Sequence, residues 1–134
     1  MVTLNVALTA LRPRVIVAEP ECGGNGALAP RLDATRFEVV SCHREQDLLE
    51  QILERRPGAL VYFIAPQRAS DLALLVLVRR MAPELPLILV ARAASAEIQE
   101  RMRSLHPACT VLRPMGDAEL NEAVAGAICG RWWG

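Results

Sequence analysis

Five short runs of β-branched and aliphatic residues recur along the chain and predict strands. The runs span 14–18, 37–42, 59–65, 85–91 and 109–113. The spacing of their starts leaves room for one crossover helix between consecutive strands, which parallel pairing requires. The middle three runs are nearly continuous in apolar residues, a pattern typical of strands that are buried on both faces of a sheet.

Capped or amphipathic segments between these runs predict the crossover helices. Four helices are well marked, over 43–56, 70–81, 96–105 and 118–129. Ser70, Ser95 and Asp117 are residue types that cap helix N-termini, and we expect Gly130 to end the last helix. The first crossover opens with a glycine-rich stretch, so we expect a loop there, followed by a short helix near 27–34.

The first residues of the chain alternate between apolar and polar side chains over 2–8. This period of two predicts a sixth, half-buried strand, either added at an edge of the sheet or exchanged with a neighbouring subunit. A loosely ordered terminus is the alternative. The chain therefore divides into an N-terminal extension (1–13), one α/β domain (14–130) and a C-terminal tail (131–134).

The amino-acid composition argues against nucleic acids and membranes as binding partners. The 134 residues, 52% of them hydrophobic, are enough for one domain with a real core. Lys plus Arg number 15 and so do Asp plus Glu, so the basic excess that nucleic-acid binding needs is missing. The longest clean apolar run, 72–78, is far shorter than the roughly 20 residues of a membrane span. With no secretory signal pattern either, we expect a cytoplasmic protein that binds neither nucleic acid nor membrane.

The four cysteines stand far apart, without a C-x-x-C pair and without histidines at zinc-site spacing. They are Cys22, Cys42, Cys109 and Cys129. We interpret them as reduced, mostly buried thiols and expect neither a metal nor a cofactor.

Five consecutive βα units predict a doubly wound sheet of five parallel strands, in the order 2-1-3-4-5, with helices on both faces. In such sheets ligands bind beyond the carboxyl ends of the strands, at the switch point between the first and third strands. The residues at and just after each strand end are therefore the candidates for function.

Three fragments at the strand ends sharpen this prediction: Arg113-Pro114 after the fifth strand, Pro57-Gly58 before the third and Leu85-Pro86 before the fourth. With the order of the segments, they make residues 14–130 resemble a response-regulator receiver domain of the CheY-like family. That family carries an acidic pair after the first strand, a phosphoryl-accepting Asp ending the third, a Ser or Thr ending the fourth, and a Lys-Pro ending the fifth.

Carried over one at a time, these functional positions are mostly altered here. They fall on Ala18, Glu19, Phe63, Ala91 and Arg113. One carboxylate of the acidic pair survives, which is a poor basis for holding Mg²⁺. A phenyl ring offers no nucleophilic oxygen, so no acyl phosphate can form at Phe63. We therefore interpret the chain as a degenerate receiver without enzymatic activity, and expect Phe63, Ala18 and Ala91 to close the former pocket by packing together.

Anion binding is an alternative use of the same edge. The loop after the first strand holds Gly23, Gly24, Asn25 and Gly26. Backbone N–H groups of such loops often bind phosphate, and Arg92 and Arg113 are expected nearby. However, the loop lacks the Lys-Ser/Thr of a P-loop, so a plain flexible loop is the simpler interpretation. Likewise, Arg113 is expected to pair with Glu19 across the former site.

The remaining functional hypothesis is that the chain acts by binding other proteins. Candidate contact residues are Ile98, Met102, Leu105, Trp132 and Trp133. In the resembled family the last two helices and the fifth strand form the dimerisation surface, and tryptophan is enriched at interfaces. We expect a homodimeric adaptor or regulator in a bacterial two-component or localisation pathway. A small-molecule or anion sensor is the alternative.

Overall fold

The computed structural model describes residues 12–19, 28–55, 57–64, 70–91, 95–112 and 116–133, with only the backbone of 55 and 131–133. The strands are β1 (Arg14–Ala18), β2 (Glu38–Cys42), β3 (Ala59–Ile64), β4 (Leu87–Ala91) and β5 (Cys109–Val111). The helices are a 3₁₀ turn, η1 (Ala29–Arg31), and α2 (Glu45–Arg55), α3 (Ser70–Met81), α4 (Ala96–Arg103) and α5 (Asp117–Trp133). Every predicted strand of the domain and all four well-marked helices are present.

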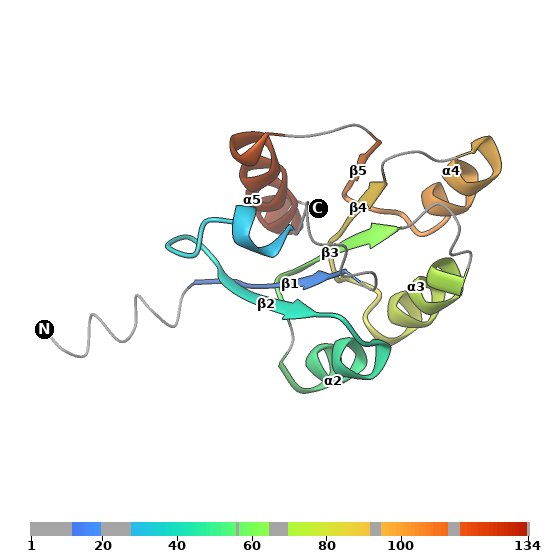
Figure 1. Ribbon diagram of the computed structural model, residues 1–134, viewed down its shortest axis with the longest axis horizontal. Coiled ribbons are helices and arrows are strands. Elements are labelled where there is room, and N and C mark those ends of the chain that lie inside the picture. Colours follow the sequence, from blue (N-terminus) through green and yellow to red (C-terminus); the bar gives the residue numbers. More distant parts are fainter. Residues whose placement is uncertain are drawn as a thin grey trace, which may run out of the picture.

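The strands pair in parallel in the order β2-β1-β3-β4-β5. Helix α5 and η1 cover one face of the sheet, whereas α2, α3 and α4 cover the other (Figure 1). The predicted doubly wound sheet is therefore confirmed. Because all strands run the same way, Ala18, Ile64 and Ala91 end their strands at one common edge.

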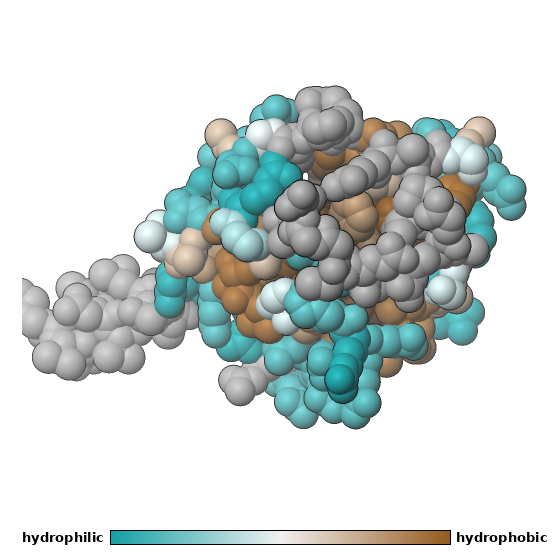
Figure 2. Space-filling model, in the orientation of Figure 1, coloured by the Kyte–Doolittle hydropathy of each residue, from teal (hydrophilic) through white to brown (hydrophobic). Residues whose placement is uncertain are grey.

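Two hydrophobic cores lie on the two faces of the sheet. Alternate residues of β3 divide between them: Leu60 and Tyr62 point to the α2–α3–α4 side, and Val61 points to the α5 side. All three side chains are fully buried, and burying a large apolar side chain contributes about 1.5–3 kcal/mol. Figure 2 shows a further apolar patch between η1 and α2, over the β2 edge, where Val39 and Val40 are half-buried.

The first crossover contains one 3₁₀ turn where the sequence predicts a short helix. Asn121 of α5, which is buried, holds this turn in place. Its side-chain amide donates to the carbonyl oxygens of Arg31 and Asp117, at 3.1 and 2.7 Å, and its Oδ1 accepts from the backbone N–H of Asp33 at 2.7 Å. The exposed pair Arg31–Asp117 adds a salt bridge at 2.7 Å. Polar contacts with α5 thus substitute for the packing of a full helix.

Two predicted helix-end signals, the Ser95 cap and the Gly130 stop, can be compared with the structure. Ser95 caps α4, because its Oγ accepts the backbone N–H of Ile98 at 3.2 Å, as predicted. The prediction that Gly130 ends the last helix is wrong, since α5 continues to Trp133. Glycine ends a helix by adopting a left-handed conformation, and Gly130 does not adopt it. A helical glycine costs only about 1 kcal/mol, which does not suffice to stop the helix.

Among the described cysteines, the predicted burial holds only for Cys42. Cys109 lies on the edge strand β5 and is half-buried, and Cys129 is exposed on α5. All three are free thiols, whereas Cys22 lies outside the described residues. Burial, assisted by the negative charge of Asp47, raises the pKa of the Cys42 thiol.

The predicted strand over 2–8 also lies outside the described residues, which begin at Arg12. There the Arg12 guanidinium donates to the Ala34 carbonyl oxygen at 2.7 Å, so the chain enters β1 beside the turn that precedes β2. Within the described part of the chain, no helix has the length and apolarity to cross a bilayer.

Candidate functional site

The carboxyl edge of β1, β3 and β4 is the candidate site. In the pairing register Ala18 lies opposite Tyr62, Phe63 opposite Val90 and Ile64 opposite Ala91. Ala18 and Ala91 are almost fully buried. At the described ends of β3 and β4, therefore, the side chains are aromatic or aliphatic where a phosphoryl-transfer site needs a carboxylate and a hydroxyl.

The expectation that Phe63, Ala18 and Ala91 pack together is wrong. Ala18 and Ala91 belong to the core under α2, α3 and α4, whereas Phe63 is half-buried against the core under α5, near Val90. The cause is the strand's pleat, which sends successive side chains to opposite faces. The aromatic ring on the same face of the sheet as Ala18 is that of Tyr62, which was not among the predicted site residues. The alternation along β3 was the signal that could have identified it.

Glu19, the surviving acid, is buried and already bonded. Its Oε1 accepts the backbone N–H of Leu28 at 2.7 Å. Its own backbone N–H donates to the Cys42 carbonyl oxygen at 3.0 Å, and its carbonyl oxygen lies 3.2 Å from Nδ1 of His43. Glu19 therefore joins the end of β1 to the start of η1 and to β2, which is a structural role.

Several predicted site residues lie outside the described part of the chain. They are Gly23, Gly24, Asn25, Gly26, Arg92 and Arg113. The glycine-rich anion site and the Glu19–Arg113 salt bridge stay predictions for that reason. Among the described residues, no group of three or more His, Cys, Asp or Glu side chains is placed to hold a metal ion.

The predicted contact residues of α4 are core residues. Met102 and Leu105 are buried among residues of the α2–α3–α4 core, and Ile98 packs against it half-buried. The prediction that Met102 and Leu105 form surface contacts is therefore wrong. The helical period correctly placed these residues on one face of the helix, but that face packs on the sheet. The side chains of Trp132 and Trp133 lie outside the described part of the structure.

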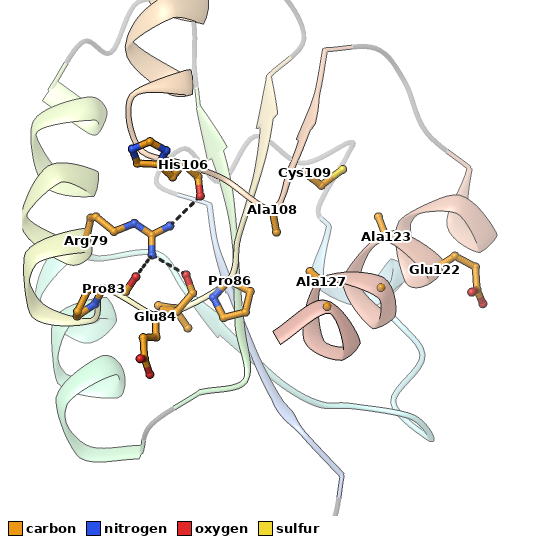
Figure 3. A pocket seen from close by; sticks show the side chains of 13 residues that line it. Arg79, Pro83, Glu84, Pro86, His106, Ala108, Cys109, Glu122, Ala123 and Ala127 are labelled. Atoms are coloured by element: carbon orange, nitrogen blue, oxygen red, sulfur yellow. Dashed lines mark hydrogen bonds between the residues drawn. The ribbon is translucent and has the colours of Figure 1, made fainter. Parts of the chain in front are cut away.

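A groove of about 590 Å³ lies at the opposite, amino edge, between the start of β5 and α5 (Figure 3). Arg79 lines this groove with Glu84, His106 and Glu122. The Arg79 guanidinium donates to the carbonyl oxygens of Leu105, Pro83 and Leu85 at 3.0, 2.9 and 2.8 Å. Burial lowers the pKa of Arg79. Because these donors are committed to backbone carbonyls, Arg79 joins the end of α3 to the turn before β5 and is not aimed at a ligand.

Solved structures with a similar fold include a receiver domain. A CheY-like response-regulator receiver domain from Methanospirillum hungatei JF-1 superposes with a TM-score of 0.75 at 14% identity, over 90% of this chain and 97% of that one. A putative pilus assembly-related protein from Burkholderia pseudomallei K96243 gives 0.72 at 20% identity, over 88% and 90%. A sensor protein from Polaromonas sp. JS666 gives 0.73 at 21% identity, over 90% and 98%.

These likenesses establish the receiver-type fold. No protein-family model matches the chain, and no curated protein matches it. At such low identities the fold alone is shared, so the use that this chain makes of it has to be inferred from its own residues.

Proposed function

We propose that this chain is a receiver-like signalling module that is not phosphorylated and acts through contacts with other proteins. The observation that carries the proposal is Phe63. It is the last residue but one of β3, at the position that the resemblance assigns to the phosphoryl acceptor, and its ring packs on the core under α5. A hydrocarbon ring cannot form an acyl phosphate.

Two neighbouring positions support the same function. Ala91 has no hydroxyl to bond a phosphoryl oxygen and is buried. Glu19 has one carboxylate oxygen engaged by the Leu28 N–H, so binding Mg²⁺ there would compete with a buried hydrogen bond. Phosphorylation would therefore require several side chains to be replaced together.

A module without this chemistry transmits a signal by binding. We propose a homodimeric adaptor or regulator whose partner is a signalling protein of a two-component or localisation pathway. One structural neighbour is a putative pilus assembly-related protein, and a localisation pathway of that kind would suit an adaptor of this fold. The proposal places the protein in the cytoplasm, where such partners act.

Phosphoryl acceptance tests the proposal directly. The purified protein is incubated with acetyl phosphate and Mg²⁺, and its intact mass is measured beside that of a receiver domain with a complete acidic site as the positive control. We expect the control to gain a phosphoryl group and this chain to keep its mass. A hydroxylamine-labile phosphoryl adduct on this chain would overturn the proposal.

A further inference from the structure

Apolar side chains are exposed on α2 and α3. Leu53 is 68% exposed, and Val76 and Leu77 are each 42% exposed. The only other exposed large hydrophobic residue in the described part of the chain is Leu112, at 37%. We call the surface around Leu53 and Leu77 the α2–α3 face.

This face is continuous across the two helices, which lie side by side on one side of the sheet (Figure 1). Leu53 of α2 and Met81 of α3 line a common groove of about 360 Å³. Leu77 stands one helical turn before Met81, and side chains four residues apart are neighbours on a helix surface. The apolar stripe therefore runs from Leu53 over Met81 to Leu77. Val76 points about 100° further around α3 and lies outside this stripe.

The stripe is bordered by charges of opposite sign. Glu50 is exposed on α2, one turn before Leu53, and Arg80 is exposed on α3, one turn after Leu77. Neither takes part in an ion pair within the described structure, and Glu50 has only a long hydrogen bond of 3.4 Å, from Gln46. Acid on one helix and base on the other make the face complementary to itself.

We propose that the α2–α3 face is the contact between two copies of this chain. An isologous dimer brings the same patch of both subunits together, so the patch has to be self-complementary. A two-fold axis that places α2 of each copy opposite α3 of the other buries Leu53 and Leu77 and sets Glu50 against Arg80 of the second copy. The formal net charge of zero leaves no overall repulsion between copies. This inference deepens the proposed function by naming the dimer surface.

Sedimentation equilibrium over a range of concentrations tests the contact. We expect the wild-type protein to dimerise and Leu77→Glu to weaken dimerisation at least tenfold. Leu112→Glu is the matched control, because Leu112 is an exposed leucine that follows β5, away from this face. Circular dichroism confirms that each variant is folded.

Charge reversal tests the pairing without disturbing the core. Glu50→Arg and Arg80→Glu should each weaken the dimer by setting like charges together, and the double variant should restore it. A wild-type protein that stays monomeric overturns the inference, as does a double variant no tighter than the single ones or a dimer that only Leu112→Glu dissociates. A monomeric wild-type protein would also remove the homodimer from the proposed function, whereas the other two outcomes reject only this contact surface. None of them changes the result of the phosphorylation test, so the lack of phosphorylation and the dimer surface fail separately.

Discussion

The carboxylate of Glu19 accepts the backbone N–H of Leu28 across a distance of 2.7 Å, and both residues are buried. The residues are nine positions apart, so this bond closes the crossover that leaves β1. In the resembled family an acid at this position serves a metal-dependent site. Here the same acid holds the shortened first crossover on the sheet.

Removing this acceptor should destabilise the fold. Glu19→Ala leaves the Leu28 N–H buried without that partner, and hydrogen bonds to charged groups contribute about 1.5–3 kcal/mol, so we expect a loss of about 2 kcal/mol. Glu19→Gln keeps an acceptor oxygen and should lose less. Urea unfolding monitored by circular dichroism measures both. Equal stability of Glu19→Ala and wild type would contradict the role given to Glu19.

Asn121 should contribute more to the free energy of unfolding than Glu122, its neighbour on α5. Asn121→Ala removes three hydrogen bonds to the first crossover and the start of α5, and should cost about 2–3 kcal/mol. The control is Glu122→Ala, which removes an exposed salt bridge to Arg36 worth no more than about 1 kcal/mol. If the two variants unfold at the same urea concentration, Asn121 does not anchor the crossover.

Arg79 should be irreplaceable by lysine. Its planar guanidinium reaches the carbonyl oxygens of Leu105 and Leu85 at once, which a single ammonium group cannot reproduce. We expect Arg79→Lys to lower the free energy of unfolding by about 1–3 kcal/mol. Arg80→Lys, at the exposed next position, should leave it within about 0.5 kcal/mol. Thermal unfolding at low protein concentration, where self-association is minimal, compares them.

The cysteines should react at different rates. Because burial and Asp47 raise the pKa of the Cys42 thiol, less of it is thiolate at neutral pH, and iodoacetamide should label it far more slowly than Cys129. A raised pKa in the folded state contributes stability while the thiol is protonated, and this contribution is lost as alkaline pH ionises it. Peptide mapping by mass spectrometry measures the rates. Labelling of Cys42 as fast as that of Cys129 would contradict its burial.

The sheet was predictable because its signal is local. Runs of apolar residues fixed the strands, and the Ser95 cap fixed the start of α4. The end of α5 was not predictable from Gly130, because glycine permits a helix to end without requiring it. The first crossover depends on Asn121, nearly ninety positions from its partners, and no local pattern reveals such a contact.

The candidate site was predictable in its chemistry and not in its packing. The residue types at the strand ends follow from the spacing of the runs. However, side chains alternate between the two faces of the sheet, so a shift of one residue along the strand changes the face that a side chain occupies. For that reason Phe63 lies on the face opposite to the expected one, and Tyr62 lies on the same face as Ala18. Similarly, the period of α4 grouped Met102 with Leu105 without showing whether that group faces the sheet or the solvent.

The most direct test of the central claim is an amide NMR spectrum recorded with beryllofluoride and Mg²⁺, a mimic of the phosphoryl group. The account predicts that the resonances of Glu19, Phe63 and Ala91 stay where they are in the spectrum of the free protein. Saturable shifts localised to these strand ends would contradict it, because they would show that the carboxyl edge still binds a phosphoryl group.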